Sequence, residues 1–354
     1  MPRDSASPKG VHQSIARIRR TGVPFDLVSR FVDHVIARRN PHEFPGVVLT
    51  KPPGDADFIW LSDEITLPSA QVMVCCAWCS NGHPKFRRGR LLWFPDEGVL
   101  RFVGHRCARS HLSAEKMALA DNEWREKKRR SARDAFLRDN CPAVEANLLV
   151  LNQLILIGNA CDQYHAKFVA LPAGIFSELA TYVRNGELFV EDQRPATGVA
   201  RPRIILGILD GLQVFEKKPN LKGSLEFSRR QLLDIQQDAH RARGGNLTHM
   251  CEKRRDVVQA LLKQAFGRIS HSALKIESFQ AFLRPQNIAL LNAWCCHETS
   301  DVARCGIEIR QEGRQKLLFK YRERGAVGLA QLEAFPVMLR AMPQFHSLRW
   351  SRPD

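Results

Sequence analysis

Four residues with metal-binding side chains lie close together in one part of the sequence. Cys76 and Cys79 form a Cys-x2-Cys pair, and Cys107 and His111 form a Cys-x3-His pair that follows after 27 residues. A tight turn can direct both sulfurs of the first pair at one ion, and residues four apart share one face of a helix. The spacing therefore predicts one zinc ion with four protein ligands. Because that shell leaves no position open for water, we expect a structural zinc rather than a catalytic one.

The elements expected around these ligands have their own sequence signals. Residues 89–94 and 99–103 are two apolar runs joined by Pro-Asp-Glu-Gly at 95–98, which predicts a β-hairpin. Ser113 is a suitable N-cap for a charged helix that extends to Asn140, and the second ligand pair is expected in the first turn of that helix.

A Cys-x2-Cys knuckle, a hairpin and a helix, in this order, resemble the treble-clef zinc finger. The resemblance covers residues 72–116 and implies that the knuckle supplies Cys76 and Cys79 and the start of the helix supplies Cys107 and His111. Cys75 and His105 lie within reach of the same ion, so either remains an alternative ligand. Some treble clefs are His-Asn-His nucleases, but the paired acid and histidine residues of that pattern are absent from this hairpin.

Positive charge is concentrated around the predicted finger. The chain has 53 Lys and Arg against 37 Asp and Glu, and residues 81–133 alone contain 14 basic and 6 acidic residues. Such an excess favours a polyanionic partner, DNA or RNA, although a solvated surface paired with nearby acids explains it too. The candidate contacts are Lys85, Arg87, Arg88, Arg90, Lys127, Lys128, Arg129, Arg130 and Arg133. Phe86, Trp93 and Phe94 either offer stacking faces to bases or pack the zinc core.

The remaining sequence predicts a mainly helical α+β protein with the finger inserted near the N-terminus. Helical spacing recurs over residues 11–39, 143–169, 228–266 and 329–339, whereas residues 186–222 predict short strands and residues 306–321 a hairpin. We expect four regions. They are an N-terminal helical arm and linker (1–57), the zinc-finger domain with its basic helix (58–140), a helical segment with short strands (141–225) and a C-terminal α+β region (226–354).

Other candidate sites have weaker signals. Cys295, Cys296, His297 and Cys305 could hold a second metal, and Cys161 and His165 repeat the Cys-x3-His spacing without a nearby partner pair. No phosphate-binding glycine loop or nucleophile elbow is present, so no catalytic residues are predicted. An enzyme site within residues 186–354 remains an open alternative.

These observations predict a zinc-stabilised nucleic-acid-binding or regulatory protein that uses the basic surface around the finger. The alternative is a protein-interaction module in which zinc is a staple and the helical regions bind a partner. The densest apolar run, residues 147–157, is too short to span a bilayer, and residues 1–20 lack the apolar core of a secretory signal. We therefore expect a cytoplasmic protein with no membrane partner, in which the ten cysteines are reduced.

Overall fold

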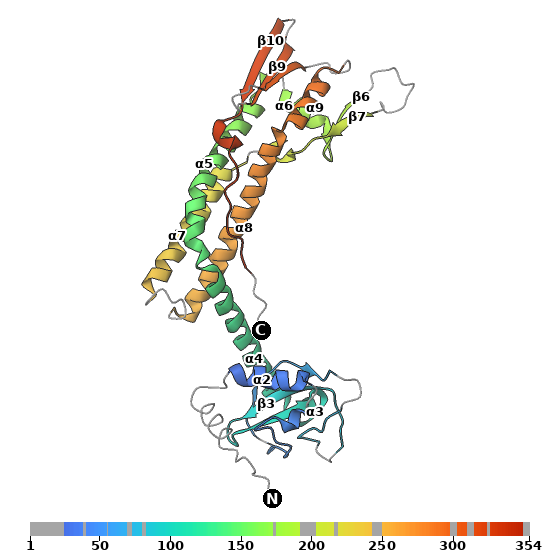
Figure 1. Ribbon diagram of the computed structural model, residues 1–354, viewed down its shortest axis with the longest axis vertical. Helices are drawn as coiled ribbons and strands as arrows, with labels where there is room; N and C mark the ends of the chain where they lie inside the picture. The colour runs from blue at the N-terminus through green and yellow to red at the C-terminus, as the bar shows by residue number, and fades with distance from the viewer. Residues whose placement is uncertain are drawn as a thin grey trace, which may run out of the picture. The chain divides into compact units, whose positions relative to one another are not determined.

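A computed structural model describes residues 25–37, 40–54, 56–68, 73–79, 83–172, 175–191, 203–215, 219–242, 250–297, 303–309, 315–323 and 326–349. The chain forms two compact units, Met1–Ser131 and Ala132–Asp354 (Figure 1). Helices together with three small antiparallel sheets give an α+β protein, as the sequence predicts. The finer division into four regions stays a prediction, since compactness alone does not test where a region folds independently.

The first unit is built on a sheet in which β3 (Arg88–Phe94) is central. On one edge β3 pairs with the short strands β1 (Ile59–Trp60) and β2 (Ile65–Thr66), and on the other edge with β4 (Val99–Gly104). The β3–β4 pair is the predicted hairpin. Both faces of β3 are covered, which explains why its sequence is an almost continuous apolar run rather than an alternating one.

Helix α2 (Phe25–Ile36) covers one face of this sheet. Its buried residues Leu27, Phe31 and Val35 recur every four positions, so they form a single stripe that packs against Leu91, Trp93 and Phe102, among others. A short 3-10 helix, η1 (Pro41–Glu43), follows it. The helix predicted from the sequence was longer, but its residues 11–24 lie outside the described part of the chain.

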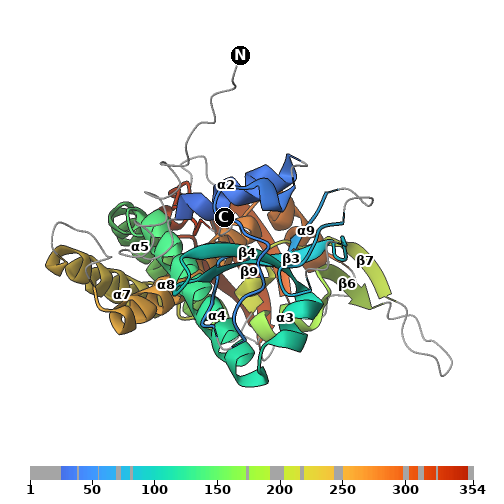
Figure 2. The same cartoon turned by 90° about the horizontal axis from the view of Figure 1, so that it is seen from below.

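The opposite face carries α3 (His105–His111) and α4 (Ala114–Asn140), with α3 beside the hairpin in Figure 2. The expectation of one continuous helix through the second ligand pair is wrong. Leu112 has extended backbone angles (φ −103°, ψ 145°) that end α3, and α4 then begins afresh. The predicted cap is confirmed, because Ser113 Oγ accepts a hydrogen bond from the Lys116 N–H at 3.2 Å.

Three long helices lie side by side in the second unit: α5 (Ala143–Val169), α7 (Leu221–Arg241) and α8 (Glu252–Phe282) (Figure 1). The bounds predicted for α5 are confirmed. The shorter elements of this unit are α6 (Ile175–Thr181), β5 (Val183–Arg184), β6 (Glu187–Glu191), β7 (Arg203–Ile208), η3 (Leu212–Phe215) and α9 (Pro285–Cys295).

The C-terminal sheet has the order β8 (Ala303–Ile309), β9 (Gln315–Glu323) and β10 (Ala326–Glu333), followed by η6 (Pro336–Leu339). The β8–β9 pairing agrees with the predicted hairpin. The helix expected over residues 329–339 is wrong. Leu329 is exposed while Ala330 and Leu332 are buried, so this segment follows the two-residue period of a strand paired with β9.

Candidate metal centre and basic surface

Cys76, Cys79 and Cys107 come together in the first unit, with their three Sγ atoms within 4.8 Å of one another. Cys76 and Cys79 lie on a turn after Val74, which forms a bridge with Phe86, and Cys107 lies in the first turn of α3. Cys76 is buried, whereas Cys79 and Cys107 are partly exposed. Sequence spacing thus predicted three residues that the fold places in one cluster.

His111, at the C-terminal end of α3, lies beside this cluster. Its Nε2 is 3.8 Å from Cys79 Sγ, and its ring stacks on Trp78 with an interplanar angle of 16° and a centroid distance of 6.2 Å. Trp78 is buried in the turn between the two knuckle cysteines, so the stacking fixes the imidazole on the side of the sulfurs.

The donor atoms have the chemistry of a metal site, with the sulfurs of Cys79 and Cys107 closer together than they would be around a bound ion. Around a tetrahedral zinc ion, two sulfurs are about 3.8 Å apart, and a sulfur and a nitrogen about 3.5 Å apart. Cys79 Sγ lies 3.0 Å from Cys107 Sγ, which is too long for a disulfide bond of about 2.05 Å. Burial and the neighbouring thiols of Cys79 and Cys76 raise the pKa of the Cys107 thiol. A coordinated divalent cation reverses that preference, because coordinating thiols are deprotonated. The cluster can therefore hold a metal ion.

Neither of the alternative ligands belongs to this cluster within the described residues. The carbonyl oxygen of Cys75 accepts a hydrogen bond from His42 Nε2 at 2.7 Å, and burial lowers the pKa of His42. His105 begins α3 and lines a cavity described below.

The other cysteines and histidines form no comparable group among the residues that the structure describes. Cys295 is buried at the end of α9 and Cys296 is exposed, while the side chain of Cys305 lies outside the described part. Cys161 and His165 are buried in the core of the second unit.

The basic residues near the knuckle differ in exposure and in whether their side chains already have a partner. Lys85, Arg87 and Arg88 are exposed, and none of their side chains has a hydrogen-bond or ion-pair partner among the described residues. Arg90 is engaged within the first unit, where its Nη1 donates to Asp121 Oδ1 at 3.0 Å and its guanidinium lies 4.9 Å from the Trp60 ring centroid.

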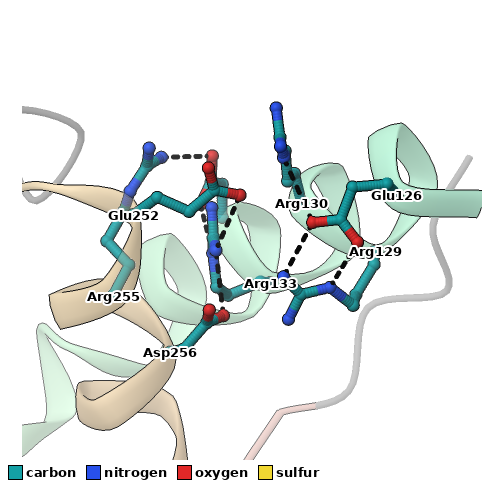
Figure 3. A network of polar contacts seen from close by, with 8 residues as sticks. Glu126, Arg129, Arg130, Arg133, Glu252, Arg255 and Asp256 are labelled. Carbon is teal, nitrogen blue, oxygen red and sulfur yellow. Dashed lines mark hydrogen bonds and ion pairs between the residues drawn. The ribbon is translucent and has the colours of Figure 1, made fainter. Parts of the chain in front are cut away.

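The basic run of α4 is partly neutralised within the first unit. Lys128 donates to Asp63, and Arg129 and Arg130 share the carboxylate of Glu126 (Figure 3). Lys127 lies 5.7 Å from the ring centroid of Trp124. Exposed ion pairs of this kind are weak, so phosphates can compete for these cations at small cost.

Arg133 does not belong with the exposed cations. Its side chain is 1% exposed and belongs to the second unit, where it donates to Asp134 and Asp256 and lies 3.6 Å from Glu252 (Figure 3). The sequence grouped it with the basic run because the acids on α8 that bury it are more than 100 residues away.

The aromatic residues near the knuckle are packing residues. Trp93 and Phe94 are buried, and Phe86 packs over two glycines of the hairpin. A Cβ on Gly89 would lie 2.5 Å from the Phe86 ring and 2.6 Å from a backbone oxygen of β4, so only glycine fits there. These rings hold the sheet together instead of offering faces for stacking.

One buried ion pair beside the site escaped the sequence reasoning. Arg101 is fully buried on β4, where it donates to both carboxylate oxygens of Glu97 and to the carbonyl oxygen of Thr50. Its guanidinium also lies 4.5 Å from the Phe94 ring centroid. The available signal was an arginine inside an apolar strand with an acid four residues before it.

Comparisons with protein-family models, with characterised proteins and with solved structures find no match to this chain. Helix α5 is long and apolar enough to cross a membrane by length and composition, and core helices of soluble proteins pass the same test. Its buried residues pack in the hydrophobic core of the second unit.

Proposed function

We propose that the first unit is a zinc-stabilised finger of the treble-clef type. The observation that carries this proposal is the convergence of three cysteine sulfurs, from the knuckle turn and from α3, with the imidazole of His111 beside them. The order of knuckle turn, β3–β4 hairpin and α3 supports it. Four protein ligands make the ion structural, since no position remains for a substrate or a reactive water.

The proposed role of this finger is nucleic-acid binding through its basic surface, in the cytoplasm. Lys85, Arg87 and Arg88 support the proposal because they are exposed cations without intramolecular partners among the described residues. Lys127, Lys128, Arg129 and Arg130 extend the contact along α4, where phosphates would replace Asp63 and Glu126 as partners. With the nearby aromatic rings packed inside, we expect contacts with the phosphate backbone of DNA or RNA and little base preference.

A salt titration of binding tests this role. We expect the affinity of a labelled duplex to fall steeply with salt, with a log–log slope that becomes about 1.8 units shallower in Arg87→Ala/Arg88→Ala, because each lost phosphate contact contributes about 0.9. Arg229 and Arg230 are exposed on α7 in the second unit, so Arg229→Ala/Arg230→Ala removes the same charge as a matched control. No binding at low salt, or equal losses in both variants, would rule out this surface.

A second candidate function, protein interaction through the helical regions, is favoured by one observation on α5. Leu149 and Leu156 are 71% and 57% exposed and are seven residues apart, so they lie on the same side of the helix. An apolar helix of a partner protein suits this pair. Capture of a defined partner from nuclease-treated lysate by the parent protein, and its loss with Leu149→Glu/Leu156→Glu, is the expected result.

A further inference from the structure

A cavity of about 170 Å³ lies within the first unit, between the sheet and helices α3 and α4. Its walls come from the sheet and from two helices. Trp60 and Arg90 contribute from β1 and β3, His105 and Arg109 from α3, and Asp121 and Arg125 from α4. One water needs only about 10 to 15 Å³ of such space, so the cavity has room for a polyatomic ligand.

Two buried hydrogen-bond donors in the wall of this cavity lack an acceptor. Trp60 is 2% exposed, and neither its indole Nε1 nor the Nε of Arg90 has a partner among the described residues. A buried N–H left unpaired has lost its bonds to water without replacement, so native proteins rarely tolerate one without a ligand or ordered water. Both residues line the cavity, so an occupant that accepts hydrogen bonds would satisfy donors that the described residues leave unpaired.

The charged side chains that line the cavity indicate the charge of its occupant. Three guanidinium groups line it against the single carboxylate of Asp121, which is already paired with Arg90. Arg109 and Arg125 are exposed at the rim and have no ion-pair partner in the described part of the chain. Guanidinium groups bind planar and tetrahedral oxyanions through parallel N–H donors, so the excess positive charge favours an anion over water.

Part of the cavity wall is already held in place without a ligand. The guanidinium of Arg90 is held between the ring of Trp60 and the carboxylate of Asp121, with its Nε–H left over. We propose that this cavity is an oxyanion site that takes a phosphate group. Trp60 and Arg90 donate to the phosphate oxygens from inside, and Arg109 and Arg125 close over it from the rim. The source of the group is either the end of a nucleic-acid strand or a small free phosphate.

Titration of the full-length protein with inorganic phosphate, at constant ionic strength set by potassium chloride, tests the site. The indole N–H resonance of Trp60 is the one missing from the nitrogen-correlated spectrum of Trp60→Phe, and we expect it to shift as phosphate is added. Calorimetry gives the affinity independently of that assignment. A resonance that stays in place, together with no heat of binding at millimolar phosphate, would overturn the proposal.

A matched pair of variants on α3 localises the binding. Arg106 and Arg109 are both exposed on this helix, but only Arg109 lines the cavity. We expect Arg109→Ala to weaken phosphate binding about tenfold or more, equivalent to about 1.4 kcal/mol, and Arg106→Ala to weaken it less than about twofold. Equal losses in the two variants would refute the cavity as the binding site.

Two further experiments distinguish the two possible sources of the phosphate group. A short oligonucleotide with a 5′-phosphate that shifts the Trp60 resonance, when its 5′-hydroxyl form does not, supports a strand end. A response to inorganic phosphate alone supports a small free anion. Arg87→Ala/Arg88→Ala should leave the phosphate response intact, so failure of the nucleic-acid proposal and failure of the cavity proposal are distinguishable.

Discussion

Removing the metal from the first unit is expected to unfold that unit and leave the second one folded. Structural zinc contributes about 10–16 kcal/mol to the folding of finger peptides, whereas a whole domain is stable by only about 5–15 kcal/mol. The apolar cluster on the metal side of the sheet contains ten buried residues, three of which, Cys76, Ala77 and Trp78, depend on the knuckle turn. The cluster of the second unit contains 40 buried residues and none of the four ligands proposed for the zinc ion.

The variant Cys107→Ser and chelation of the parent protein provide the perturbation. We expect one zinc per chain in the purified parent and none in the variant, measured by elemental analysis. X-ray absorption should find three sulfurs at about 2.3 Å and one nitrogen at about 2.0–2.1 Å. Circular dichroism should retain the signal of α5, α7 and α8 after chelation, while the fluorescence of Trp60, Trp78 and Trp93 changes.

Control variants test the other residues that the sequence analysis kept as possible metal ligands. Cys296→Ser, at an exposed position on the end of α9, should leave the zinc content unchanged, and so should Cys75→Ser. A metal-free parent whose first unit stays folded would refute the reasoning, as would zinc retained by Cys107→Ser. Zinc lost from Cys296→Ser would place the ion in the other cysteine cluster.

Three further predictions concern the frame around these sites. Glu97→Gln should destabilise the first unit by about 3 kcal/mol in chemical denaturation, because the buried guanidinium of Arg101 loses its charged partner. Gly211→Ala should cost the second unit about 2–4 kcal/mol, since φ is +81° and the new Cβ would lie 2.2 Å from a backbone oxygen of α8. Burial pushes the pKa of Asp63 up, but hydrogen bonds from Lys128 and Trp124 outweigh it and hold that pKa below its usual range. The stability that this carboxylate contributes is present above its unfolded pKa and is lost as the pH falls through the lower folded pKa. The difference in thermal midpoint between the parent and Asp63→Asn should therefore start to shrink near about pH 4 and go on shrinking as the pH falls further.

Features that depend on short stretches of sequence were predictable. Pro142 and Pro172 bracket α5, whose bounds came directly from the sequence, and Ser113 caps α4 as expected. The metal cluster belongs to the same class, since each ligand pair spans fewer than six residues and the hairpin between them has a clear turn. Local chemistry is sufficient in these cases because the partners are neighbours in the chain.

Features that depend on distant partners were not predictable. Arg133 has the same local surroundings as Arg129 and Arg130, yet acids from α8 bury it, whereas its neighbours stay on the surface. Helix α8 continues well beyond its predicted end at residue 266, and α9 was missed, because their buried faces are defined by the helices against which they pack. The unpaired N–H groups of Trp60 and Arg90 were likewise unpredictable, because they become buried only when strands and helices from separate parts of the sequence pack together.

Helix α3 links the two proposed sites and gives them a fixed order of dependence. Cys107 and His111 face the knuckle, while His105, Ala108 and Arg109 of the same seven-residue helix line the cavity. So short a helix is not stable alone, so its position depends on the metal ligands and on the sheet. Loss of zinc should therefore abolish phosphate binding, whereas Arg109→Ala should weaken phosphate binding about tenfold or more and leave the zinc content at one per chain. If phosphate binding instead survives in Cys107→Ser, the cavity does not depend on the zinc ion, and the sheet and α4 alone form it.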